Sequence, residues 1–331
     1  MLRPLLSTAI LALLSTPALA EAPRVTTDIG PVQSLAAMVM EGVGAPSVIL
    51  RPGASPHGYA LRPSEARALE QADVVFWVSP DLTPWMEEAI HTLADDATIV
   101  ELLHTQGTTA LPFRLGATFE KHRHAPEEVD GHDDHGYDDH GHDDHAHDEK
   151  ADDDHAQDAM FPDTDPHAWL DPENGKVWVT AMAEALAQRD PDNAATYRQN
   201  ADAARARIDA ASASVAAQLA PVAGQSFVVF HDSYQYFEQR FGLSAAGSIS
   251  LGDATAPGPA RLAEIRHAVK DLGVSCVFSE PQFNAGLVAT VTEGTDTRTA
   301  ELDPLGSTLA PGPDLYPQLL TAMGSAMAGC L

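Results

Sequence analysis

Short apolar runs alternate with stretches of helical periodicity between residues 24 and 101. The run at 74–78, Val-Val-Phe-Trp-Val, has no polar alternation, which is typical of a strand buried on both faces of a parallel sheet. Strands and helices in this order form βα units, which build parallel sheets covered by helices. The predicted strands cover 24–29, 48–50, 74–78 and 98–100, and the predicted helices cover 31–41, 63–71 and 84–93.

The same alternation returns in the second half of the chain. Between the halves, an Ala-rich stretch from 191 to about 219 carries apolar residues at three- and four-residue spacing, which predicts a long helix after a first one at 172–188. The later strands are predicted at 227–230, 243–249, 276–278 and 297–302, and the later helices at 233–241, 259–272, 284–292 and 314–328.

The predicted fold class is α/β, with two lobes of βα units and parallel-type sheets joined by one long rigid linking helix. A chain of 331 residues suits two lobes better than one core. The predicted bounds are 21–190 for the N-terminal lobe, 191–220 for the linking helix and 221–331 for the C-terminal lobe.

The first twenty residues are typical of a secretory signal peptide. Arg3 supplies a positive start, an apolar run follows at 5–14, and Ala18-Leu19-Ala20 offers small residues for cleavage. The run is too short for a membrane anchor, which needs about 20 apolar residues. No Cys follows it to carry a lipid. We therefore expect removal of residues 1–20 and a soluble periplasmic protein.

An insert at about 120–160 consists almost entirely of Asp, His, Glu, Gly and Ala, and nine of the fifteen histidines lie within it. It has almost nothing apolar to bury, so it is predicted to be disordered. Imidazoles bind Zn²⁺ when neutral, and nearby carboxylates concentrate cations. The predicted accessory weak zinc sites are His132, His135, His140, His142, His145, His147 and His155. A merely solvated acidic loop is the alternative.

The formal net charge of −29 argues against nucleic acid or an anionic membrane surface as a partner. The chain has two cysteines, Cys276 and Cys330, and in an exported protein this pattern predicts one disulfide. Such a bond would pin the last helix to the body of the protein. Metal ligation by the two thiolates is the alternative.

Four side chains outside the insert are candidates for a ligand site. In open α/β sheets, ligands bind beyond the carboxyl ends of the strands. His231 directly follows a predicted strand, His57 lies in a loop after another, His167 follows the insert, and Asp303 follows the strand that ends at 302. Spacing alone identifies no site, because these residues are far apart in the chain. The remaining histidines are interpreted as ordinary polar residues: His91, His104 and His267.

Five motifs, the His-rich insert and the cysteine pair together resemble the zinc-specific solute-binding proteins of bacterial ABC importers, the ZnuA-like family. The motifs are GASPHGYALRPS at 53–64, HAWLDP at 167–172, FHDSYQYF at 230–237, SEPQF at 279–283 and LDPLG at 302–306. The resemblance covers nearly the whole mature chain. It implies two α/β lobes, metal in the cleft between them, and delivery to an ABC permease and its ATPase in the inner membrane. We expect a monomer.

The resemblance also implies the ligands, which are here His57, His167 and His231. In related manganese- and iron-binding members a carboxylate replaces His231, and the position of Asp303 supplies a ligand. Three imidazoles favour Zn²⁺ over Mn²⁺, which prefers oxygen donors. Some zinc members carry Glu just before the first histidine, where this chain has Pro56. The fourth ligand is therefore left to water, to Asp303 or to a histidine of the insert.

Other classes of function stay open at this point. Three histidines with an open position also describe catalytic zinc, for which Glu280 or Asp303 could serve as the base. No His-Glu-x-x-His motif occurs in the chain, and we predict that the protein is not an enzyme. A sequestering or adhesive metal-binding protein without a transporter, and the binding protein of a manganese importer, are the further alternatives.

Overall fold

The computed structural model describes residues 22–114, 119, 164–250 and 257–331. The predicted signal peptide and the accessory histidines of the insert lie outside the described residues. Within them, each strand and helix predicted from the sequence is present, and most bounds differ by one to three residues.

The N-terminal lobe contains a parallel sheet with strand order β2-β1-β3-β4. The chain moves outward from β1 to β2 and then returns to the other side of β1, so a topological switch point lies between β1 and β3. Asp28, directly after β1, accepts hydrogen bonds from the backbone N–H groups of Ile29 and Val78 and so joins these two strand ends. The elements are β1 (Val25–Thr27), α1 (Gly30–Val39), β2 (Ser47–Val48), α2 (Pro63–Glu70), β3 (Val74–Trp77), α3 (Pro84–Leu93) and β4 (Thr98–Glu101).

The C-terminal lobe repeats this arrangement with strand order β6-β5-β7-β8, again all parallel. Its switch point lies between β5 and β7, at the strand ends that carry His231 and, one residue beyond β7, Glu280. The elements are β5 (Phe227–His231), α6 (Gln235–Phe241), β6 (Ala245–Ser250), α7 (Pro259–Asp271), β7 (Cys276–Ser279), α8 (Gly286–Thr292) and β8 (Arg298–Glu301). The two parallel sheets with their helices confirm the predicted α/β fold class.

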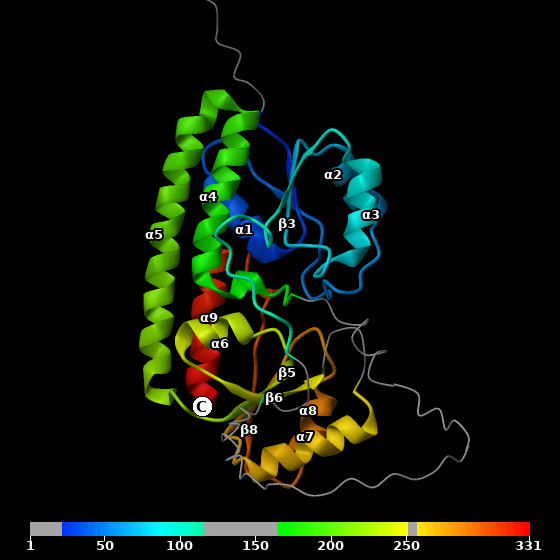
Figure 1. Ribbon diagram of the computed structural model, residues 1–331, viewed down its shortest axis with the longest axis vertical. Helices are drawn as coiled ribbons and strands as arrows, with labels where there is room; N and C mark the ends of the chain where they lie inside the picture. Colours follow the sequence, from blue (N-terminus) through cyan, green and yellow to red (C-terminus); the bar gives the residue numbers. More distant parts are fainter. Residues whose placement is uncertain (1–21, 115–118, 120–163, 251–256) are drawn as a thin grey trace, which may run out of the picture.

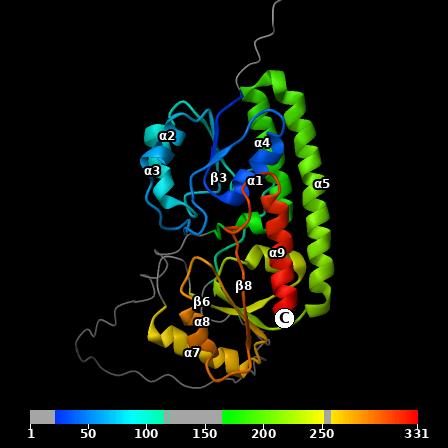
Figure 2. The same ribbon diagram turned by 180° about the vertical axis from the view of Figure 1, so that it is seen from behind.

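A long helix, α5 (Ala194–Leu219), runs beside both lobes, and Figures 1 and 2 show it along one side of the molecule. It packs against α4 (Pro172–Arg189) and α9 (Leu315–Cys330), so the connection is a layer of helices around α5. The lobe bounds predicted from the sequence stay a prediction.

The helices of this layer approach closely where they carry glycine. A Cβ atom on Gly324 of α9 would lie 2.5 Å from the Gln218 side chain and 3.2 Å from Val215 of α5. A Cβ atom on Gly175 of α4 would lie 2.6 Å from the hydroxyl of Tyr316. A larger residue at either position would force Tyr316, or Gln218 and Val215, to shift, so glycine here allows the helices to pack closely.

One apolar core continues from the first sheet through the helical layer into the second sheet. It includes Phe76 of β3, Trp178 of α4, Phe227 of β5 and Met323 of α9. Two smaller clusters fill the outer faces of the two sheets. The two lobes are thus joined by shared packing as well as by the chain. Among the described residues, no helix combines the length and apolarity needed to cross a bilayer.

The predicted disulfide is present between Cys276 of β7 and Cys330 at the end of α9, with 5.9 Å between the two Cα atoms. It closes a loop with a sequence separation of 54 residues. The alternative of thiolate ligation is therefore wrong for this structure.

We expect the double variant Cys276→Ala/Cys330→Ala to lose about 3–4 kcal/mol of unfolding free energy, because the unfolded chain regains the freedom that the bond removes. Urea denaturation followed by circular dichroism measures this loss. A reductant should destabilise the wild type by a similar amount and leave the variant unchanged. Equal stability of the oxidised wild type and the variant would contradict the prediction.

Candidate metal centre

Three histidines from separate parts of the chain converge between the lobes. His57 comes from the loop between β2 and α2, His167 lies just before the short 3₁₀ helix Ala168–Leu170, and His231 is the last residue of β5. Each offers a ring nitrogen, and these atoms lie within 4.8 Å of one another. The Nε2 atom of His167 is 3.4 Å from the Nε2 atoms of both His57 and His231.

The separation of these nitrogens fits a tetrahedral metal. Zn–N bonds of about 2.0–2.1 Å at tetrahedral angles place neighbouring nitrogens about 3.3–3.4 Å apart. His167 and His231 are buried, whereas His57 is half-buried. Among the residues that the structure describes, no second group of His, Cys, Asp or Glu side chains is placed to hold a metal ion.

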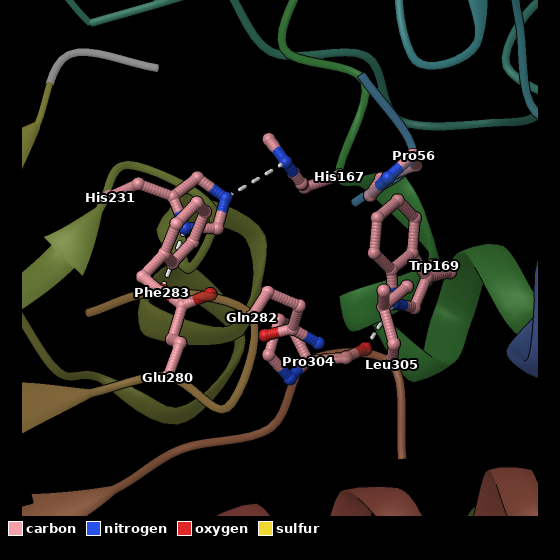
Figure 3. Close-up of a pocket in the computed structure, with 9 residues that line it drawn as sticks. All are labelled: Pro56, His167, Trp169, His231, Glu280, Gln282, Phe283, Pro304 and Leu305. Atoms are coloured by element: carbon pink, nitrogen blue, oxygen red, sulfur yellow. Dashed lines mark hydrogen bonds and ion pairs between the residues drawn. The ribbon is translucent and has the colours of Figure 1, made fainter. Parts of the chain in front are cut away.

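A buried carboxylate orients the ring of His231. The Nδ1 atom of His231 is 2.6 Å from Oε1 of Glu280, which follows β7 on the other side of the switch point. With Nδ1–H donating to this carboxylate, Nε2 carries the lone pair that faces His167 (Figure 3).

A second carboxylate does the same for His167. Asp165 accepts hydrogen bonds from both the backbone N–H and the Nδ1 atom of His167, at 3.0 and 2.7 Å. Asp165 is itself held in place, because its N–H donates to Leu111 and its carbonyl accepts from the Tyr236 hydroxyl. Burial raises the pKa of Asp165 to about 7, although the hydrogen bond from His167 acts in the opposite direction. Just beyond, Asp171 caps the start of α4 and fixes the exit of this segment.

The loop of His57 is held from its outer side. The indole N–H of Trp85 donates to the carbonyl of Pro56 at 2.6 Å. Glu65 on α2 accepts from the Tyr59 hydroxyl, from the Arg62 backbone N–H and from the side chain of Arg51. Burial opposes ionisation of Glu65, yet these hydrogen bonds keep its pKa below the usual value.

The cavity beside the histidines is small and mostly apolar. Its volume is about 10 Å³, room for roughly one water molecule or ion. Figure 3 shows Gln282 in the middle of the labelled side chains, with His231 and Trp169 on opposite sides of it. Its lining consists of Pro56, His167, Trp169, His231, Glu280, Gln282, Phe283, Pro304 and Leu305.

A charged network lies behind His231. Arg114 pairs with Asp232, the residue after His231, and with Glu238 of α6. Burial raises the pKa of Asp232 to about 6, although Arg114 lowers it. The guanidinium of Arg114 also stacks 4.0 Å above the ring of Phe119, whose N–H donates to the carbonyl of Ala246 on edge strand β6.

Asp303, the fourth residue singled out from the sequence, lies outside the histidine group. Its carboxylate accepts from the N–H groups of Leu305 and Ser307, from the Ser307 hydroxyl and, at 3.5 Å, from the Gln282 amide. Its role as a fourth ligand stays a prediction.

Sequence reasoning missed the supporting residues Asp165 and Trp85 and considered Glu280 only as a catalytic base. The Asp-Pro-His order at 165–167 is a usable signal, because an Asp two residues before a His can accept from its backbone and ring. The position of Glu280 is also a usable signal. It directly follows the buried strand β7, and His231 is the last residue of the buried strand β5, so both lie at strand ends where ligands bind.

Comparison with known proteins adds independent information. The model of the family described as zinc-uptake complex component A, periplasmic (ZnuA), matches residues 25–330. The chain belongs to this family. It is 44% identical over 307 residues to the high-affinity zinc uptake system protein ZnuA of Brucella abortus (strain 2308), covering 93% of this chain and 91% of that protein. The protein of the same name from Paracoccus denitrificans (strain Pd 1222) is 44% identical, with 100% and 99% covered.

The ZnuA family membership agrees with the fold. A crystal structure of ZnuA superimposes with a TM-score of 0.71, at 21% identity, and covers 93% of this chain and 99% of that one. At this identity the match describes the fold alone.

We expect Asp165→Asn and Glu280→Gln each to weaken zinc binding about 10–100-fold, because each removes the charge that orients and polarises a ring while keeping its shape. Competition with a fluorescent zinc chelator measures the affinity. The matched controls Asp202→Asn and Glu264→Gln, on exposed faces of α5 and α7, should bind as the wild type does. Wild-type affinity in both site variants would show that the carboxylates do not support the ligands.

Proposed function

We propose that this protein captures Zn²⁺ in the periplasm through His57, His167 and His231 and delivers it to an ABC permease and its ATPase. The observation that carries the proposal is the pair of 3.4 Å separations between Nε2 atoms, which fit a tetrahedral zinc ion. Membership of the ZnuA family and the zinc uptake named for its relatives support the same cargo.

The donor set favours zinc over manganese. All three candidate ligands are imidazoles, which suit Zn²⁺, whereas Mn²⁺ prefers carboxylate and water oxygens. The buried carboxylates Asp165 and Glu280 face the Nδ1 atoms and leave the Nε2 atoms to the metal. No observation on the described residues favours adhesion, sequestration or manganese transport.

The same geometry gives no support to hydrolysis. A catalytic zinc needs a base beside its open position, and Glu280 instead holds the far side of the His231 ring. Asp303 is occupied by the N–H and hydroxyl groups of its own turn.

The three candidate ligands differ in burial, which distinguishes the part of the site that stays in place from the part through which zinc passes. His167 and His231 are buried on a shared core and supported by carboxylates, so they form a preorganised pair. His57 is half-buried and belongs to a loop that Trp85 and Glu65 hold from outside. We infer that zinc enters and leaves past His57, with the buried pair remaining in place.

Each of His57→Ala, His167→Ala and His231→Ala is expected to lose tight zinc binding, by at least 100-fold for the two buried positions, because each removes one of three nitrogen donors. Isothermal titration calorimetry with chelator competition measures the affinity. His91→Ala and His267→Ala, both exposed, are the matched controls and should keep the wild-type affinity. Retention of tight binding in all three site variants would refute the ligand assignment.

Deletion of 132–155 should remove additional weak zinc equivalents and leave one tight site, because the three cleft histidines lie outside that segment. Equilibrium dialysis at increasing zinc concentration measures the stoichiometry. An unchanged number of bound ions would exclude the insert as an accessory zinc store.

A further inference from the structure

Gln282 places an amide group in the cavity that His167 and His231 line, and the ligand assignment gives it no role. It lies in the segment that leaves β7, two residues after Glu280, and Figure 3 shows its side chain between His231 and Trp169. Its Oε1 atom is buried and has no hydrogen-bond partner among the described residues. A buried acceptor without a partner costs free energy, so its retention here requires an explanation.

The neighbouring carboxylate determines which way the amide points. The Nε2 atom of Gln282 lies 3.5 Å from Oδ1 of Asp303, and a carboxylate only accepts hydrogen bonds. The nitrogen therefore faces Asp303 and the oxygen faces away from it. Asp303 cannot turn aside, because three donors of the turn at 303–307 hold its oxygens.

Apart from the Glu280 carboxylate, no other side chain of the lining carries an oxygen acceptor. Proline, phenylalanine and leucine supply four of the nine lining residues, and the indole N–H of Trp169 already donates to the carbonyl of Pro304. The Oε1 atom of Glu280 bonds the far side of the His231 ring. Gln282 is thus the lining residue whose side chain carries an uncharged oxygen acceptor.

A zinc ion held by three imidazoles takes a fourth ligand, and Pro56 supplies no donor at the position before His57. We propose that the fourth ligand is a water molecule and that the Gln282 amide oxygen accepts a hydrogen bond from it. The cavity volume of about 10 Å³ suits such a molecule. This inference rests on the proposed function. Asp303 then acts behind Gln282, by holding the amide, and does not touch the metal.

An uncharged amide at this position suits an ion that must be released, whereas a carboxylate would bind the ion itself. The amide orients the water without adding negative charge. The protein then supplies three ligands, and the water in the fourth position can exchange. The amide oxygen also repels a ligand that has lone pairs and no proton to donate. Gln282 should therefore favour water over a monodentate anion.

The test uses the full-length mature protein loaded with Co²⁺, whose visible absorption reports the ligands of a zinc site, and titrates it with azide. Gln282→Met keeps the length of the side chain and removes the acceptor. We expect this variant to bind azide about three- to tenfold more tightly than the wild type, the range that one neutral hydrogen bond contributes. Gln188→Met, on an exposed face of α4, is the matched control and should titrate as the wild type does.

The possible outcomes separate the two proposals. Identical azide affinity in wild type and Gln282→Met, with His167→Ala still abolishing the Co²⁺ spectrum, would overturn the role of Gln282 and leave the proposed function intact. A wild type that does not respond to azide, beside a Gln282→Met variant that does, would show that Gln282 itself ligates the metal and would overturn the bridging water. An unchanged Co²⁺ spectrum in His167→Ala would instead refute the ligand role of His167, on which both proposals rest. Thermal unfolding of the metal-free variants verifies that each is folded.

Discussion

The site depends on one constraint. Two imidazoles that are 110 and 64 residues away from His167 in the chain must each bring an Nε2 atom to 3.4 Å from its Nε2 atom. Uncharged rings gain little from such proximity, so the surrounding structure has to impose it. The apolar core that runs from β3 through α4 and α9 to β5 does so, because it packs both lobes against one set of helices. The two carboxylates at Nδ1 then decide which nitrogen of each buried ring faces inward. The position comes from packing and the ring orientation from hydrogen bonds.

Charge explains why such a site favours a cation. Two buried carboxyl groups, Asp165 and Glu280, contact the histidine rings, and two more, Asp232 and Glu238, pair with Arg114 behind His231. Burying negative charge without compensation is costly, which is why burial raises the pKa of Asp165 to about 7. A divalent ion bound at the Nε2 atoms would balance the negative charge of the carboxylates that contact the Nδ1 atoms of the same rings. The same carboxylates that orient the ligands therefore also strengthen their attraction for metal.

The sequence predicts the fold of this protein better than its site. Apolar runs such as 74–78 and the returning βα rhythm identify the strands and helices, because burial leaves a direct mark on the residues that pack. The strand-end rule places His231, and resemblance to a family was needed for His57 and His167, which lie in loops. The roles of Asp165 and Gln282 depend on contacts across a tertiary structure. No local pattern encodes the distance from Gln282 to Asp303 or the convergence of three distant rings.

The residues on either side of the segment between Phe119 and Thr164 are held by contacts of their own, which has a consequence for His167. On one side, Arg114 is fastened to Asp232 and Phe119 to edge strand β6; on the other, Thr164 pairs with Pro112 directly before Asp165. With both roots fixed by described residues, a change of length between them need not be transmitted to His167. The contacts that place His167 therefore lie on its own side of the segment, and the ligand site does not depend on the residues between 119 and 164 for its position.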